Sequence, residues 1–516
     1  MRCMAANAAP NILLITSDQQ HWDTLGVTNP RIKTPALDRL CREGTRFDRA
    51  YCPNPTCSPT RASIITGQYP AWHGCWTIGV KTPEDVLTVG DVFQQYGYAS
   101  ILVGKAHFQP LKSVPGSESL ECQPTLRDLD FWRRFHGPWY GFSHVETARM
   151  HGDESHVGQH YAIWMEEHGL KDWAEYFQPW PPKPNKGGDD RYFLREGRHW
   201  KLPEKFHHTR WIAERTIANL QSCAARGKPF FLWSSFFDPH PPYIISEPWA
   251  SMYQPGDMVP GRYTDGEFDR MPPHFGKTRE PRPDYTMYDE PGGAGLHGFH
   301  SHLRDEQELK KDIACYYGMV SFMDQQIGLI LDALDRLGMA DNTLVVFTSD
   351  HGHYLGQHGL IAKGPFHYED GVRVPMIVRT PGVAGGGVSR SMQSLVDYAP
   401  SFLSYAGIKP PGQMQGVDQS GVWAGRQDSA RDHVIVENRH NPTKVHLRTY
   451  IDQRYKVTVY RDQPYGELFD LEADPQELRN LWDEPSAAGV KARLLHRFVQ
   501  ADLQREPTRM PRVTGA

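Results

Sequence analysis

The chain has 516 residues, of which 39% are apolar and 23% are charged, and its formal net charge is −5 at pH 7. This composition is typical of folded globular proteins and excludes a disordered or coiled-coil chain. The slight acidic excess argues against nucleic acid or an anionic membrane as a partner, and no apolar run reaches the roughly 18 residues of a membrane-spanning helix.

The first residues and the cysteines indicate where the protein works. The apolar stretch at residues 12–15 is too short for the core of a secretory signal, so we expect a cytoplasmic protein. Eight cysteines are present without a C-x-x-C pair. In a chain of this length, that usage favours reduced thiols over a disulfide framework.

Four β-branched or aromatic runs recur along the chain, at residues 11–16, 99–103, 229–237 and 343–348. Near-continuous apolar runs that alternate with helical patterns predict parallel strands that are buried on both faces. A polar cluster follows each run. Because open α/β sheets bind ligands at the carboxyl ends of their strands, we expect these clusters to form one site.

The remaining elements predict two domains. Apolar residues at helical spacing predict a helix over 313–337 that ends at Gly338, and another over 395–408. We expect a large α/β domain over residues 1–425, with long surface insertions at about 110–205 and 240–310. A small α+β domain is expected over 426–516, with antiparallel strands at 434–437, 448–451, 455–460 and 467–471 and a helix around 487–503.

The segment that begins at Cys57 has an unusual helix start. Ser58 suits an N-cap and Pro59 a first helical position, so Cys57 would lie at a helix N-terminus, where the dipole lowers a thiol pKa and attracts anions. Arg61 in the first turn is unfavourable for the helix itself, which indicates an acidic or anionic partner. In isolation, a packed cysteine and a surface arginine would be the ordinary explanation.

Carboxylates follow the first and the last of the four runs. Asp18 follows the first, and Asp350 with His351 follows the last. One aspartate after a strand often only caps a turn, but two of them beside an imidazole favour a divalent cation. An imidazole ligand shifts the preference from Ca²⁺ toward a borderline ion such as Mn²⁺.

Basic groups follow the two middle runs and the last one. Lys105 and His107 would point to the same side of an extended chain, and with His240 and Lys363 they could supply cations and proton-transfer groups for an anionic substrate. Taken singly, each is more often a surface residue. Histidines also stand at 353, 358 and 367, and spacing alone does not distinguish them from the candidate site residues.

The pentapeptide Cys57-Ser58-Pro59-Thr60-Arg61, read with Thr66-Gly67, resembles the C-x-P-x-R signature of the type I sulfatases, in the alkaline phosphatase superfamily. The resemblance covers most of the chain and includes residues 11–19, 34–40, 104–107, 239–240, 350–352, 355–359, 363 and 466–471. It implies an alkaline-phosphatase-like fold, in which a large mixed, mostly parallel sheet lies between helices and a small C-terminal domain carries an antiparallel sheet.

The resemblance also implies a sulfuric ester hydrolase with a defined site. A maturation enzyme would oxidise Cys57 to formylglycine, whose hydrate is the nucleophile. Asp18, Gln19, Asp350 and His351 would hold one divalent cation that also touches residue 57, with Ca²⁺ expected and Mn²⁺ as the alternative. Arg61 and Lys105 would stabilise negative charge, His240 and Lys363 would contact the sulfate and assist the leaving alcohol, and His107 would be the base that collapses the sulfated hemiacetal.

Two positions depart from the common pattern of the family. Many sulfatases have aspartate where Gln19 stands and asparagine where His351 stands, whereas Gln/His pairs occur in the branch with phosphonate monoester hydrolases. The phosphonate hydrolases replace the Lys105/His107 pair with uncharged residues, so its retention here favours sulfate. A phosphonate or phosphodiester hydrolase stays as one alternative, and a non-catalytic binder of sulfated ligands with an unmodified Cys57 as another.

The insertions bear on the substrate. They are rich in aromatic and basic residues, namely Trp132, Arg133, Arg134, Trp139, Tyr140, Trp173, Trp180 and Trp200. Such residues suit stacking on sugar or aryl groups, and they equally suit packing of the insertions onto the core or a subunit interface. We expect a sulfated carbohydrate over a simple aryl or alkyl sulfate. The oligomeric state stays open, a homo-oligomer included.

Overall fold

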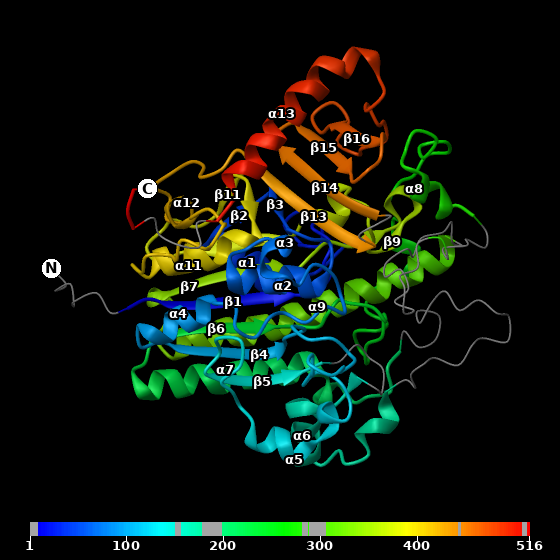
Figure 1. Ribbon diagram of the computed structural model, residues 1–516. Coiled ribbons are helices and arrows are strands. Elements are labelled where there is room, and N and C mark those ends of the chain that lie inside the picture. The colour runs from blue at the N-terminus through cyan, green and yellow to red at the C-terminus, as the bar shows by residue number, and fades with distance from the viewer. Residues whose placement is uncertain are drawn as a thin grey trace.

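The computed structural model describes residues 9–149, 156–177, 199–280, 287, 306–441, 445–507 and 513–515. Within these residues, an eight-stranded sheet forms the centre of the molecule, in the order β11-β2-β10-β7-β1-β6-β4-β5 (Figure 1). Its strands are β1 (Asn11–Ser17), β2 (Thr45–Phe47), β4 (Ala99–Lys105), β5 (His144–Ala148), β6 (Phe230–Ser235), β7 (Thr343–Ser349), β10 (Met376–Arg379) and β11 (Gly387–Ser389).

The sheet is mixed and mostly parallel, as the sequence predicts. Strands β7, β1, β6, β4 and β5 run parallel to their neighbours, and only β10 runs antiparallel to β7 and β2. Thr16 of β1 lies opposite Ser235 of β6 and Thr348 of β7. The three strands therefore end side by side, and the polar residues that follow them meet at one edge of the sheet.

Helices cover both faces of the sheet. On one face, α1 (Pro35–Glu43), α6 (Gln159–Glu167), α7 (His208–Arg226) and α9 (Glu306–Arg336) share one apolar core with Leu13 and Ile15 of β1. On the other, α2 (Cys57–Thr66), α4 (Val89–Gln95) and α11 (Tyr398–Tyr405) share a second core with Ile12 and Leu14. Successive side chains of a strand point to opposite faces, so residues 12–15 of β1 are apolar on both faces.

Short elements complete the part of the chain around the main sheet. They are α3 (Pro70–His73), α5 (Leu129–Arg134), α8 (Pro273–Lys277), α10 (Glu369–Val372) and α12 (Ser420–Trp423), the pair β3 (Ala50–Tyr51) with β12 (Gln393–Ser394), and the pair β8 (Tyr354–Leu355) with β9 (Ile361–Ala362). Within the described residues, no helix is both long and apolar enough to cross a membrane.

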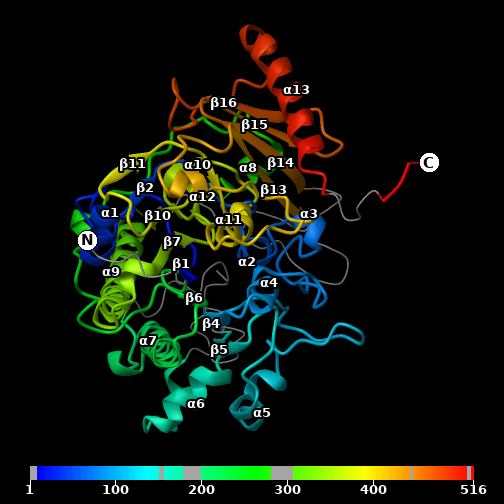
Figure 2. The same cartoon turned by 90° about the vertical axis from the view of Figure 1, so that its left-hand side faces the viewer.

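The C-terminal region folds as an antiparallel sheet of β13 (His433–Asn441), β14 (Val445–Asp452), β15 (Tyr455–Tyr460) and β16 (Gly466–Asp470), with α13 (Ala488–Gln504) on one face (Figure 2). Tyr450 and Val457 pack on Phe498 of α13, whereas Val434 and Val436 belong to the core of the large sheet. The boundary at 425/426 stays a prediction.

The insertion expected at about 110–205 differs from a set of surface loops. It contributes β5, which pairs with β4 as an edge strand of the main sheet. Five of its aromatic residues (Trp132, Trp139, Tyr140, Trp173 and Trp200) are buried, while Arg133 and Arg134 are exposed. Four of these rings therefore pack the insertion onto the core, whereas Trp132 packs on Phe135 and His160 within the insertion. Trp180 lies outside the described residues.

Candidate active site

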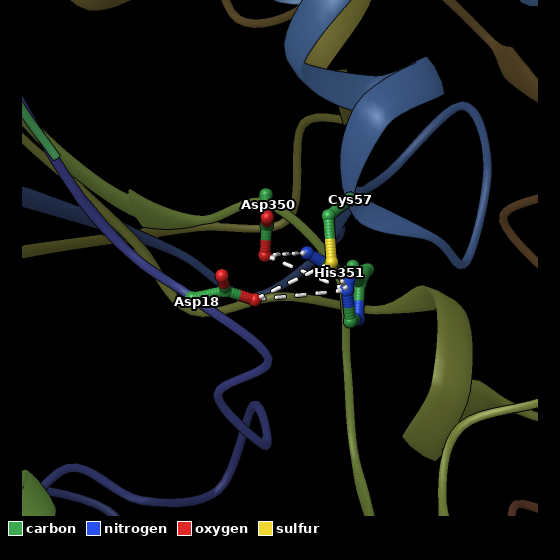
Figure 3. A group of neighbouring side chains, drawn as sticks. All are labelled: Asp18, Cys57, Asp350 and His351. Carbon is green, nitrogen blue, oxygen red and sulfur yellow. Dashed lines mark hydrogen bonds and ion pairs between the residues drawn. The ribbon is translucent and has the colours of Figure 1, made fainter. Parts of the chain in front are cut away.

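Four side chains from three distant segments converge at the carboxyl edge of the sheet (Figure 3). Asp18 follows β1, Asp350 and His351 follow β7, and Cys57 begins α2. All four are buried, and one potential ligand atom from each lies within 4.8 Å of the others. Neighbouring parallel strands end together, so residues more than 300 positions apart meet here.

The start of α2 explains how Cys57 is held. The helix begins at Cys57 with Thr56 as N-cap, so the expected cap at Ser58 is wrong. Asn54 Oδ1 accepts hydrogen bonds from the backbone N–H of Thr56 (2.9 Å) and from its hydroxyl (2.5 Å), which holds Thr56 in an extended conformation. Cys57, and not Pro59, is therefore the first helical residue. The expected place of Cys57 at a helix N-terminus is confirmed, and unpaired N–H groups there favour an anion.

Cys57 Sγ lies in a positively charged environment. Lys363 Nζ is 3.1 Å from the sulfur, His351 Nε2 is 3.2 Å away and Asp18 Oδ1 is 3.6 Å away. Burial and the charge of Asp18 oppose ionisation of this thiol, but Lys363, Lys105 and His351 outweigh them and lower its pKa.

Arg61 is fully buried and bridges the site. Its Nε donates to Asp350 Oδ2 (2.9 Å), and its Nη1 donates to the Lys105 carbonyl (2.8 Å) and to Ser235 Oγ (2.7 Å). Nη2 lies 3.8 Å from Asp18 Oδ2 without a hydrogen-bond partner. The acidic partner that the sequence predicts for this arginine is therefore Asp350.

Asp18 is the second carboxylate in the cluster and pairs with Lys105 Nζ. Burial alone would raise the pKa of Asp18, but Lys105, His240, Arg61 and Lys363 together hold it well below its usual value of 3.8. Asp18 is therefore a carboxylate at any physiological pH.

His351 presents one ring nitrogen to the cluster. Its Nδ1 lies 3.0 Å from the Gly352 carbonyl, which can only accept a hydrogen bond, so the ring proton sits on Nδ1. In the neutral ring, Nε2 then carries a lone pair. Asp350 stabilises the protonated form and raises the pKa of His351, although burial opposes this.

Gln19 keeps one side-chain oxygen available beside the cluster, and its backbone N–H donates to Asp350 Oδ1 (3.0 Å). Its Nε2 is bonded to His353 Nδ1 (2.8 Å), whereas its buried Oε1 has no hydrogen-bond partner. Tyr243 OH bonds to the other nitrogen of His353 (2.7 Å), and Tyr316 stacks on its ring. Two carboxylates, an amide oxygen and an imidazole nitrogen are the donor set of a hard or borderline divalent cation, so the residues fit such an ion.

His240 and Lys363 contact each other at the cluster. His240 Nδ1 lies against the Pro241 carbonyl, so its Nε2 accepts from Lys363 Nζ (3.3 Å). Burial, together with the charge of Lys363, lowers the pKa of His240 well below 6.5. In this pair, the proton donor is therefore Lys363.

His107 lies beyond the end of β4 and has a φ of 57°. The expectation of an extended chain between Lys105 and His107 is therefore wrong. Glu121, which is buried, accepts the backbone N–H of His107 (2.9 Å), and Arg149 Nη2 lies 2.7 Å from His107 Nε2. A guanidinium can only donate, so Nε2 accepts and the ring proton sits on Nδ1. Burial and Arg149 hold the pKa of His107 well below 6.5.

Direct contacts join eight of the residues that the sequence indicates: Asp18, Cys57, Arg61, Lys105, His240, Asp350, His351 and Lys363. The Gln19 backbone N–H bonds to Asp350 Oδ1 (3.0 Å), and the charges of Lys105, Arg61 and Lys363 act on His107. Further partners, to which no motif points, are Glu121, Arg149, Ser235, Tyr243 and Tyr316, with His353 as a support of Gln19. Their contacts join residues that lie between 14 and 334 positions apart. The other two uncertain histidines lie elsewhere: His358 stacks on Tyr368, and His367 bonds to Thr449.

Comparison with known proteins gives a consistent assignment. The family model described as Sulfatase matches residues 10–408, and the model described as N-sulphoglucosamine sulphohydrolase, C-terminal, matches residues 356–504. An arylsulfatase from Clostridium perfringens is 28% identical and aligns with 92% of this chain and 90% of its own length. An N-acetylglucosamine-6-O-sulfatase from Bacteroides thetaiotaomicron is 25% identical over 96% of this chain and 86% of its own length.

Among solved structures, the phosphonate monoester hydrolase of Agrobacterium radiobacter superposes with a TM-score of 0.76, at 24% identity and over 96% of both chains. This likeness extends over the main sheet and the C-terminal region. It establishes the overall fold that the sequence resemblance implies.

Proposed function

The chain belongs to the sulfatase family, and we propose that it hydrolyses a sulfate monoester of a carbohydrate at the cluster around Cys57. The observation that carries this proposal is the charge of the cluster: three basic side chains (Arg61, Lys105 and Lys363) surround two carboxylates (Asp18 and Asp350) in a buried space. A divalent cation would add to this excess of positive charge. Such a site suits an anionic ester, because negative charge builds up on the leaving oxygen in the transition state.

Maturation of Cys57 to formylglycine is part of the proposal. The hydrated aldehyde at residue 57, the first helical position of α2, would supply the nucleophile. Support comes from the place of Cys57, where its side-chain atom contacts Lys363 and His351 at the dipole end of α2. The proposal requires a formylglycine-generating enzyme as a partner.

For the metal, we propose that Asp18, Gln19, Asp350 and His351 hold one Ca²⁺ beside residue 57, with Mn²⁺ as the alternative. The unpartnered Oε1 of Gln19 and the lone pair on His351 Nε2 support this set. When bound, the ion would polarise the sulfate oxygens and favour deprotonation at residue 57.

The other side chains take roles that follow from their contacts. Arg61, fixed by Asp350 and Ser235, has an Nη2 that remains able to donate to a substrate oxygen. Lys105 neutralises charge beside Asp18, and Lys363, oriented by His240, protonates the leaving alcohol. His107 acts as the base for release of the product, which requires Arg149 to leave its Nε2.

A carbohydrate substrate is supported by the sugar sulfatases among the relatives and by the C-terminal family match. The buried tryptophans of the insertion do not contribute to this argument, because they pack the core. Phosphonate or phosphodiester hydrolysis is the second candidate, and the Gln19–His351 pair at the cluster favours it.

The test uses metal-replete enzyme with two sets of substrates. One set contains sulfated mono- and disaccharides, and the other contains three esters that share 4-nitrophenol as the leaving group: the sulfate, a phosphodiester and a phosphonate. We expect the highest kcat/KM on a sugar sulfate and a loss of turnover of at least about 10⁴-fold in Cys57→Ala. Higher kcat/KM on the phosphodiester would select the second candidate.

Mass spectrometry of the peptide that contains residue 57 separates the enzyme from a binding protein. Formylglycine lowers the peptide mass by about 18 Da, whereas the ordinary oxidation of cysteine raises it. A peptide that keeps its thiol after expression with a maturation enzyme, together with unchanged turnover in Cys57→Ala, contradicts the proposed mechanism.

A further inference from the structure

A second group of metal-binding side chains lies outside the Cys57 cluster. It comprises His207 and His208, at the start of α7, and Asp238, three residues after β6. All three are buried, and one potential ligand atom from each lies within 4.8 Å of the others. No motif in the sequence points to these three residues.

Hydrogen bonds explain only part of this second group. His207 Nδ1 accepts the backbone N–H of Thr209 (3.2 Å) and so caps α7, but its buried Nε2 has no hydrogen-bond partner. The Thr209 hydroxyl bonds to Asp238 Oδ2 (2.5 Å) and lies 3.2 Å from His208 Nδ1. A buried imidazole nitrogen without a partner is costly unless something binds it.

The surroundings of the group are aromatic and provide no cation. Trp200 and Phe322 pack edge-on against His207, and Phe237 packs against His208. Within the described part of the chain, Asp238 forms no ion pair with lysine or arginine, and its nearest basic group is His208 Nε2 at 3.7 Å. The carboxylate therefore has no compensating positive charge within the group, and the buried, negatively charged Asp18 lies nearby.

We infer that His207, His208 and Asp238 bind a divalent transition-metal ion, with the Thr209 hydroxyl as an adjacent oxygen donor. Two imidazole nitrogens and a carboxylate oxygen are typical ligands of Zn²⁺, and they distinguish this site from the oxygen-rich set around Asp18. The inference does not depend on the proposed sulfatase reaction, since binding is measured without turnover.

Such an ion would hold two elements that position the active site. The Asp238 carbonyl accepts the backbone N–H of Asp18 (3.1 Å), and His240 lies two residues further along the chain. An ion that ties α7 to the end of β6 would therefore restrain both residues. We expect a structural ion whose loss loosens the active site without removing any group that touches the substrate.

Zinc binding to the full-length protein tests the inference. Chelator-treated wild type is dialysed against Zn²⁺ in the presence of excess Ca²⁺, which keeps the oxygen-rich site occupied, and the bound zinc is counted by elemental analysis. We expect one tightly bound zinc per chain, both in wild type and in Cys57→Ala. Zinc that disappears in Cys57→Ala, or that fails to bind at all, overturns the inference.

Variants locate the ion. Asp238→Asn keeps the acceptor for Thr209, and His207→Asn keeps a helix cap but removes the imidazole, so each is designed to preserve the fold. We expect each to weaken zinc binding by at least about 10-fold. The control is His274→Gln, which replaces a buried histidine outside both groups and should bind zinc as wild type does. Unchanged affinity in folded His207→Asn contradicts the site.

Discussion

At the scale of single residues, the balance of charge in the active site decides both stability and chemistry. Arg61 is buried, and its guanidinium is neutralised by Asp350 through a 2.9 Å contact. A surface counterpart exists in Arg39 and Asp332, which lie 2.8 Å apart with Asp332 half exposed. Removal of one partner from a buried pair leaves a charge without water or a counterion.

We predict that Asp350→Asn lowers the free energy of unfolding by about 3–5 kcal/mol, because Arg61 stays buried and charged. Asp332→Asn should change it by less than about 1 kcal/mol, since water screens the surface pair. Urea unfolding of both variants, without added metal, measures the difference. Equal losses in the two variants would mean that the Arg61 contact adds nothing to stability.

Arg149 controls the ionisation of His107. Burial and the Arg149 charge both lower the pKa of His107, so the neutral form persists to acidic pH. In Arg149→Met the charge is absent and the pKa of His107 rises toward 6.5. A larger share of His107 is then protonated near pH 6, so the acidic limb of the kcat profile moves to higher pH.

Arg149→Lys keeps the charge and should return the acidic limb toward its wild-type position, although a lysine cannot reproduce the guanidinium geometry. The pH dependence of kcat for the three proteins measures this. A limb that stays in place in Arg149→Met would show that His107 is not the group whose ionisation controls the rate.

At the scale of elements, the C-terminal sheet contains a buried acidic group. Glu467 of β16 accepts the Tyr460 hydroxyl of β15 (2.5 Å) and lies near Glu477 and Lys456. Burial and Glu477 raise its pKa from 4.5 to about 7, against the effects of Tyr460 and Lys456. The folded state therefore holds this proton more tightly than the unfolded chain.

Because the pKa of Glu467 is raised on folding, its protonated form stabilises the protein below pH 4.5, and this contribution is lost as the pH rises to about 7. Glu467→Gln keeps the acceptor for Tyr460 but does not titrate. We predict that the stability of the variant relative to wild type increases by on the order of 3 kcal/mol between pH 4.5 and 7 and is constant above pH 7. A difference in unfolding free energy that does not change with pH would contradict this.

At the scale of the whole molecule, the C-terminal region supports the loop that carries Cys57. Glu437 of β13 donates its N–H to the Pro53 carbonyl (2.8 Å), and its own carbonyl accepts from Asn54 (2.7 Å). Lys456 of β15 binds Glu369 at the start of α10 (2.9 Å). Val434 and Val436 lie in the core of the large sheet.

We predict that a chain truncated after residue 425 does not form a stable large domain, because it exposes the core that Val434 and Val436 cover and frees the loop at Asn54. Soluble yield and circular dichroism of the 1–425 fragment, beside the full-length protein, measure this. A folded, active fragment would show that the C-terminal region is dispensable and would support an independent domain boundary there.

The sequence by itself determined four central strands of the sheet (β1, β4, β6 and β7), the place of the site and the types of group in it. Buried strands are continuous apolar runs, and parallel strands end at one edge, so Asp18, Lys105, His240 and Asp350 could be assigned to one site from local patterns. The start of a helix at Cys57 also follows from local signals, although the cap itself is Thr56.

Only the tertiary structure decided which partners fix each group. Ser235 and Arg61 are 174 residues apart. Arg149, which follows β5, contacts His107, which follows β4. The burial of the insertion tryptophans and the grouping of His207 with Asp238 are equally non-local. Such contacts depend on how packed elements are placed in space, and periodicity along a chain describes a single element and not its neighbours.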